Sequence, residues 1–110
     1  MTTLGDKNCR ERKGEPALSR GQAQDMLREI PGWALNDSAS EISRSYKFGN
    51  YYETLAFVNA LAWIVHREDH HPDLEVGYNR CKIRFSTHSV NGLSENDYIC
   101  AAKINALRGE

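Results

Sequence analysis

The sequence has no long apolar run, and this absence limits where the chain is expected to act. No stretch approaches the roughly 18 apolar residues of a membrane span, and the polar start, Met1 to Asp6, lacks the apolar core of a secretion signal. We therefore expect a cytoplasmic protein with no membrane partner. An excess of positive charge is also absent, since the formal net charge is −1 at pH 7. This balance argues against a nucleic-acid partner, because such binding depends on neutralising phosphates.

The sequence has few cysteines, and none of them lies close to another in the sequence. The chain has three cysteines, Cys9, Cys81 and Cys100, and none of them forms a C-x-x-C pair. An odd number at wide spacing indicates neither a disulfide framework nor a cysteine zinc site. Reduced thiols, as in a cytoplasmic protein, fit this pattern best.

The length and composition are those of one ordinary globular domain. The chain has 110 residues, of which 40% are hydrophobic and 26% are charged. A chain of this length and composition can form a single hydrophobic core without disulfides or a structural metal. Residues 1–17 contain Gly5, Gly14, Pro16 and a mixed charge run, but no apolar stripe that would anchor them. We expect a disordered N-terminal tail over residues 1–17 and a single domain over residues 18–110.

Capping residues and apolar periodicity predict the elements of this domain. Helix starts are expected at Ser19, Asn50 and Ser94, where each capping residue is followed three positions later by glutamine, glutamate or aspartate. Alternation of apolar and polar residues predicts two hairpins, over residues 33–48 and 74–87. The order helix, hairpin, helix, hairpin, helix is typical of an α+β fold, in which an antiparallel sheet is covered on one face by helices.

The histidines are concentrated in one part of the chain. All four, His66, His70, His71 and His88, lie within one short stretch, and Pro72 follows His71 directly. The longest predicted helix loses its apolar residues just before His70, so we expect a fixed, exposed corner at a helix C-terminus. The second hairpin then returns the chain, which can bring His88 close to this corner. Histidine exchanges a proton near neutral pH without large tuning.

Three interpretations of this cluster are open. In a metal site, His66 and His70 would share one helix face, as in H-E-x-x-H, but the glutamate of that motif is missing and a third ligand would have to come from elsewhere. In a structural role, a histidine at a helix end would only cap carbonyl groups. In metal-free acid–base catalysis, two imidazoles held apart would donate and accept protons near pH 7. The gathering of four histidines favours the last interpretation.

The spacing of these residues resembles a family signature. His66-x3-His70-His71-Pro72-x5-Tyr78-x9-His88-x8-Asp97 is similar to the signature of the pterin-4a-carbinolamine dehydratase family, also called the dimerisation-cofactor family. Further matches include Pro31-Gly32-Trp33, Tyr78-Asn79-Arg80 and Gly92-Leu93, and the resemblance covers about residues 18–108.

This resemblance implies a fold and an activity. The fold would be α+β, with a four-stranded antiparallel sheet and three helices. The activity would be dehydration of 4a-hydroxytetrahydropterin to quinonoid dihydropterin, without metal or organic cofactor, which recycles the cofactor of aromatic amino acid hydroxylases. A hydroxylase of that pathway is an expected partner, and the protein is expected to form a homodimer or homotetramer, because a small sheet leaves open edges. The alternative is a non-catalytic dimerisation cofactor or assembly factor on the same fold.

The resemblance also implies roles for individual residues. The catalytic residues would be His70, His71 and His88. The substrate-binding residues would be these three together with Pro72, Thr87, Ser89 and Val90, while His66 and Asp97 would support the site. We expect His70 and His88 to transfer protons and His71 to orient the substrate, with the choice of acid and base left open. The sequence departs from the family pattern at His66, where a carboxylate is common, and at Leu74, where some members carry tryptophan.

Overall fold

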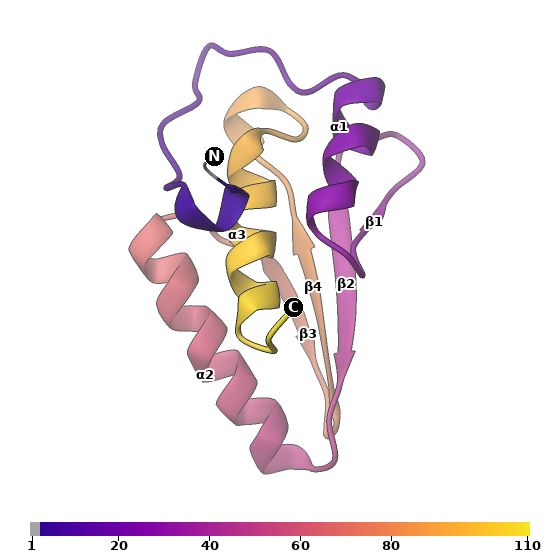
Figure 1. Cartoon of the computed structure of the whole chain (residues 1–110), viewed down its shortest axis with the longest axis vertical. Coiled ribbons are helices and arrows are strands. Elements are labelled where there is room, and N and C mark those ends of the chain that lie inside the picture. The colour runs from indigo at the N-terminus through magenta and orange to yellow at the C-terminus, as the bar shows by residue number, and fades with distance from the viewer. Residues whose placement is uncertain (1–2) are drawn as a thin grey trace.

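A computed structural model describes residues 3–110 (Figure 1). Its helices are α1 (Arg20–Met26), α2 (Tyr51–Glu68) and α3 (Glu95–Ala106), and its strands are β1 (Ala34–Leu35), β2 (Ile42–Lys47), β3 (Asp73–Val76) and β4 (Arg80–Phe85). Short 3₁₀ turns form η1 (Leu4–Asp6), η2 (Leu27–Glu29) and η3 (His88–Val90). The predicted order of helix, hairpin, helix, hairpin, helix is confirmed.

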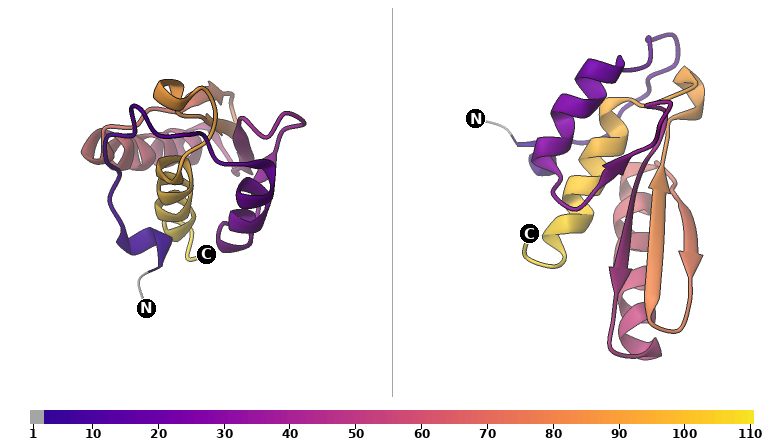
Figure 2. Two further views of the ribbon diagram at one scale, coloured as in Figure 1. Left: turned by 90° about the horizontal axis from the view of Figure 1, so that it is seen from above. Right: turned by 90° about the vertical axis from the view of Figure 1, so that its right-hand side faces the viewer.

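The four strands form one antiparallel sheet in the order β1-β2-β4-β3. Ile42 lies opposite Phe85 and Tyr46 opposite Cys81, and these four side chains are buried. The alternate residues of β2 and β4 point to the other face and remain partly or fully exposed. The helices lie on the buried side of the sheet, as the two views of Figure 2 show. The expected α+β fold is therefore confirmed.

Local hydrogen bonds explain why the helices begin where the sequence predicts. The Ser19 Oγ accepts from the Gln22 N–H at 3.1 Å, and the Gln22 side chain accepts from the Ser19 N–H at 2.9 Å. Asn50 caps α2 by accepting from the Glu53 N–H at 2.9 Å. Each contact satisfies an amide that the first helical turn leaves without a partner.

One buried amide joins the sheet to α3. The Asn105 Oδ1 accepts from Trp33 Nε1 at 2.8 Å, from the Tyr46 hydroxyl at 2.7 Å and from Arg44 Nη1 at 2.9 Å. Its Nδ2 donates to the Pro31 carbonyl at 3.0 Å. Burial raises the pKa of Tyr46 to about 12, so its hydroxyl keeps the proton that it donates to Asn105. Asn105 therefore satisfies several groups that would otherwise be buried without partners.

The N-terminal segment differs from the expected disordered tail. Residues 1 and 2 lie outside the described residues, but residues 3–17, which we call the arm, run along α3 (Figure 1). Leu4 is buried, and the guanidinium of Arg12 is almost fully covered beside Glu95. The Leu18 N–H then donates to the Leu93 carbonyl at 2.9 Å. The side chains that hold the arm in place are isolated in the sequence, so no periodic pattern of apolar residues predicts them.

We predict that Asn105→Ala lowers the free energy of unfolding by about 2–4 kcal/mol, because it leaves the buried Trp33 and Tyr46 donors without an acceptor. Urea denaturation measures the change. Asn59→Ala, on the exposed side of α2, is the matched control and should change stability by less than about 0.5 kcal/mol. Equal effects of the two substitutions would contradict the role assigned to Asn105.

Candidate active site

The end of α2 fixes the position of the histidine corner. Asp69 adopts a left-handed conformation, with φ of 52°. The Asp69 N–H donates to the His66 carbonyl at 3.3 Å, and the His70 N–H donates to the Val65 carbonyl at 3.2 Å. These two bonds form a Schellman motif, which ends the helix and satisfies its last carbonyl groups. The backbone of His70 is thereby held directly against the helix terminus.

The imidazole of His70 is paired with a buried carboxylate. Its Nε2 lies 2.6 Å from the Asp97 Oδ1. The Asp97 side chain has 0% exposure and that of His70 has 12%. The imidazole also stacks on the Phe85 ring, with centroids 5.7 Å apart and an angle of 4° between the planes. The ring of His70 is therefore fixed on one edge and on one face.

The second oxygen of Asp97 is held by neighbouring segments. The Asp97 Oδ2 accepts from the Thr87 hydroxyl at 2.8 Å and from the Ser94 N–H at 3.0 Å. The latter bond completes the capping box of α3, so Asp97 caps this helix as well as binding His70. The hydroxyls of Thr87 and Ser94 lie 2.8 Å apart and hold each other in place.

This arrangement determines the neutral tautomer of His70. An ionised carboxylate only accepts hydrogen bonds, so His70 must donate to Asp97 through an Nε2–H group. The Nδ1 of His70 then carries a lone pair and has no hydrogen-bond partner within residues 3–110. It is the nitrogen of this ring that is available to accept a proton from a bound molecule.

A cleft of about 260 Å³ gathers most of the predicted site residues. It is lined by Asp69, His70, His71, Pro72, Asp73, Ser86, Thr87, His88 and Ser89. His71 and His88 are exposed, whereas His70 is half-buried. The three histidines expected to act in catalysis therefore border the same cleft. Asp69, Asp73 and Ser86 were not predicted, although all three adjoin predicted residues in the sequence.

Three predicted site residues do not line this cleft: Asp97, which is buried behind His70, and Val90 and His66. Val90 ends η3 and is half-buried, whereas its neighbours His88 and Ser89 border the cleft. His66 lies on α2 and stacks on the exposed Trp63, with ring centroids 5.9 Å apart. Because α2 ends at Glu68, His66 and His70 do not share a helix face, and the geometry proposed for a metal pair is wrong. Within residues 3–110, no group of three or more histidine, cysteine, aspartate or glutamate side chains is arranged to hold a metal ion.

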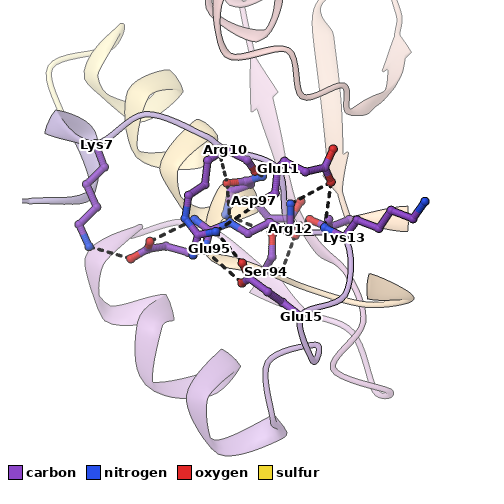
Figure 3. A network of polar contacts seen from close by, with 11 residues as sticks. Lys7, Arg10, Glu11, Arg12, Lys13, Glu15, Ser94, Glu95 and Asp97 are labelled. Atoms are coloured by element: carbon purple, nitrogen blue, oxygen red, sulfur yellow. Dashed lines mark hydrogen bonds and ion pairs between the residues drawn. The ribbon is translucent and has the colours of Figure 1, made fainter. Parts of the chain in front are cut away.

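A second cavity adjoins the cleft and was not predicted from the sequence. It measures about 340 Å³ and is lined by Cys9, Arg10, Glu11, Arg12, Glu68, Asp69, His70, Thr87, Ser89 and Asn96. The arm provides one wall, and a polar network connects it to the start of α3 (Figure 3). Within this network the Lys7 ammonium holds the pKa of the Glu95 carboxyl below its ordinary value. The hydrogen bond with the Cys9 thiol, 3.6 Å away, and burial both raise the pKa of the Cys100 thiol, which stays protonated.

The fold and the cleft define a class of protein: a small α+β domain that presents three histidines at one site, one of them paired with a buried carboxylate. Residues 16–107 match the family model described as pterin 4 alpha carbinolamine dehydratase. The chain belongs to this family, as its signature predicts. None of the helices formed by residues 3–110 is long and apolar enough to cross a membrane.

Several relatives share this family. A Stenotrophomonas maltophilia protein named "Putative pterin-4-alpha-carbinolamine dehydratase" is 55% identical over 108 residues, which cover 97% of this chain and 93% of the relative. A protein of the same name from Nitrosomonas eutropha is 50% identical, covering 94% of this chain and 92% of the relative.

Two solved structures have similar folds. The Brucella melitensis "transcriptional coactivator/pterin dehydratase" is 34% identical with a TM-score of 0.80, covering 84% of this chain and 99% of that one. A "pterin dehydratase-like protein" described as a RuBisCO assembly factor in the alpha-carboxysome is 25% identical with a TM-score of 0.62, covering 72% of this chain and 92% of that one.

We predict that neutral His70 carries its proton on Nε2, because Asp97 accepts from that atom. Nitrogen-15 NMR of the histidine side chains measures the tautomer directly. The rings of the exposed His71 and His88 have no hydrogen bonds within the described chain, so they are the internal controls and should show mixed tautomers. A His70 ring protonated on Nδ1 would contradict the geometry of the pair.

Proposed function

We propose that the protein dehydrates 4a-hydroxytetrahydropterin to quinonoid dihydropterin by histidine acid–base catalysis. The observation that carries this proposal is the His70–Asp97 pair at a cleft that His71 and His88 also border. Membership of the pterin-4a-carbinolamine dehydratase family supports the choice of substrate. In this role the protein would act in the cytoplasm and recycle the pterin used by aromatic amino acid hydroxylases.

The reaction requires one group that accepts a proton and one that donates a proton. The N5–H bond breaks, its electron pair forms the C4a=N5 double bond, and the hydroxyl at C4a leaves with a proton as water. Two imidazoles can perform both transfers near neutral pH. This reaction needs no oxidant and no metal. It leaves the acceptor histidine with one more proton and the donor histidine with one fewer, and proton exchange with solvent restores both.

We assign the proton acceptor to His70, because Asp97 supports that role. When Nδ1 takes the proton, His70 becomes an imidazolium whose Nε2–H still points to the buried carboxylate, and this ion pair stabilises the new charge. The C-terminus of α2 favours the same cation. His88, which is exposed and lines the same cleft, is then assigned to protonate the leaving hydroxyl. His71 and Pro72 bind and orient the ring system, together with Thr87 and Ser89.

We predict that the protein accelerates the loss of 4a-hydroxytetrahydropterin in a stopped-flow assay. His70→Ala should lower the turnover rate on the order of 10²- to 10⁴-fold, as expected when acid–base catalysis is lost. Chelator treatment should leave the rate unchanged. His66→Ala is the matched control, since this histidine does not line the cleft, and it should retain the wild-type rate. A folded His70→Ala variant with full activity would exclude the proposed role of His70.

A second function has one specific observation in its favour. The similar structure described as a RuBisCO assembly factor shows that a pterin dehydratase-like fold is used for assembly in that protein. A non-catalytic dimerisation cofactor or assembly factor would need exposed apolar surface but no proton-transfer pair. No acceleration over the spontaneous rate in the same assay would favour this second function.

We also propose that the protein forms a homodimer or homotetramer. Large apolar side chains are exposed on α2 and near the edge strand β3, namely Tyr52 at 81%, Trp63 at 64% and Tyr78 at 66%. Within residues 3–110, β3 pairs with β4 alone and is the last strand of the sheet, so its outer edge leaves backbone groups unpaired. Light scattering coupled to size exclusion should give a mass of two or four chains at several concentrations. A monomer throughout this range would contradict the proposal.

A further inference from the structure

Two of the three cysteines lie side by side, one in the arm and one in α3. The Cys9 Sγ is 3.6 Å from the Cys100 Sγ, although the two residues are 91 positions apart in the sequence. Both thiols are free. We propose that a hydroperoxide oxidises this pair to an intramolecular disulfide, which fastens the arm to α3. This inference does not depend on the proposed function, since the oxidation needs no pterin.

The two sulfurs need only a small approach to form a disulfide. The S–S bond has a length of about 2.0 Å, so each side chain would move by less than about 1 Å. Residues 7–18, which include Cys9, form neither a helix nor a strand. The backbone of the arm can therefore adjust to the bond while Cys100 keeps its place in α3.

The difference in exposure decides which thiol the peroxide meets first. Cys9 is half-buried and lines the cavity of about 340 Å³ beside the histidine cleft, whereas Cys100 is fully buried. Hydrogen peroxide is small enough to enter a cavity of this size. The raised pKa of Cys100 keeps its thiol protonated, and a protonated thiol is a poor nucleophile. Cys9 is therefore the thiol that reacts with peroxide, and Cys100 is the neighbouring thiol that completes the disulfide.

The oxidation balances in two steps. In the first step the Cys9 sulfur attacks one oxygen of hydrogen peroxide, the O–O bond breaks, and the thiol proton leaves with the other oxygen as water. In the second step the Cys100 sulfur attacks the sulfenic acid on Cys9, the S–O bond breaks, and the Cys100 proton leaves with the hydroxyl as water. The two thiols lose two electrons, which the peroxide gains. A dithiol reductant reverses the change by thiol–disulfide exchange.

The disulfide would reinforce contacts that are otherwise hydrogen bonds alone. The Cys9 N–H donates to the Glu68 Oε1 at 2.7 Å, which joins the arm to the end of α2. The Asn96 side chain donates to the Arg10 carbonyl at 2.7 Å and accepts from the Arg10 N–H at 3.2 Å. These contacts lie where the arm lines the cavity beside His70. A covalent bond at Cys9 would keep this wall in place when the hydrogen bonds open.

Cys81 is an internal control in the same chain. It is free and as fully buried as Cys100, but it makes no contact with another thiol within residues 3–110. Oxidation that follows from the paired geometry should therefore leave Cys81 unchanged. Trypsin separates the three cysteines, because they fall in the peptides 8–10, 81–82 and 85–103.

The test treats the reduced, full-length protein with hydrogen peroxide at a dose that fully oxidises glutathione. The remaining thiols are then alkylated in denaturant, and the tryptic peptides are identified by mass spectrometry. We expect peptides 8–10 and 85–103 joined by a disulfide, Cys81 alkylated, and a single chain under non-reducing denaturing conditions. Dithiothreitol should restore three free thiols. Three alkylated cysteines after peroxide, a link to Cys81, or a link between two chains would overturn the inference.

Two variants test the order of the steps. In Cys100→Ala the sulfenic acid on Cys9 has no partner thiol, so dimedone should capture it on peptide 8–10. In Cys9→Ser the buried Cys100 should stay unoxidised. Oxidation of Cys100 in Cys9→Ser, or no dimedone adduct on Cys9 in folded Cys100→Ala, would contradict the assigned order. The peptide map of the wild-type protein decides whether the disulfide forms even where Cys100→Ala fails to fold.

Hydrogen exchange measures whether the disulfide fastens the arm. The amide of Arg10 donates to the Asn96 side chain and is released when the arm lifts from α3. Oxidation should slow the exchange of this amide at least roughly tenfold, because the disulfide blocks that local opening, and reduction should restore the original rate. Equal exchange rates in the reduced and oxidised protein would overturn the proposed fastening of the arm.

Discussion

The buried carboxylate of Asp97 is the constraint on which the site depends. A charge with no solvent exposure is costly unless hydrogen bonds compensate it. Asp97 receives these bonds from His70, just beyond α2, from Thr87, just beyond β4, and from the Ser94 amide at the start of α3. One side chain thus joins three segments that are distant in sequence. Removing it would loosen the ends of the helices and the histidine together.

This constraint also explains why the site can be small and still be ordered. His70 is held by Asp97 on its edge, by Phe85 on its face and by the Schellman motif at its backbone. The neighbouring His71 and His88 are exposed and have no comparable supports. The three histidines are therefore not equivalent, and their difference in support is the physical basis for assigning them different roles. The arm adds a further polar wall to the same region through Asn96, which directly precedes Asp97 in α3.

Much of this could be predicted from the sequence, because the relevant signals are local. The capping residues Ser19, Asn50 and Ser94 mark the helix starts correctly, and alternation identifies both hairpins. The loss of apolar residues at the end of α2 marks the histidine corner in the sequence. These features depend on neighbours three or four positions away.

Other features depend on contacts between distant segments, and no local pattern in the sequence predicts them. The arm is held by a hydrogen bond between Arg12 and Asn96, which are 84 positions apart. No periodic pattern in the sequence predicts a contact of this kind. His70 and Asp97 are 27 positions apart. The capping motif predicts that Asp97 caps α3, but it does not predict the hydrogen bond to His70. Nearness in sequence groups His66 with the other histidines, but α2 ends between His66 and His70. Val90 follows two cleft residues in η3 and still does not line the cleft.

We propose that Asp97 orients His70 so that its Nδ1 faces the reacting edge of a bound pterin. A crystal structure of the protein with 5,6,7,8-tetrahydrobiopterin, which has the N5–H but no hydroxyl at C4a and so cannot lose water, tests this orientation most directly. We expect the pterin to lie in the cleft with its N5–H within hydrogen-bond reach of His70 Nδ1, while His70 Nε2 keeps its bond to Asp97. A pterin bound elsewhere, or a His70 ring turned away from Asp97 to meet it, would contradict the account.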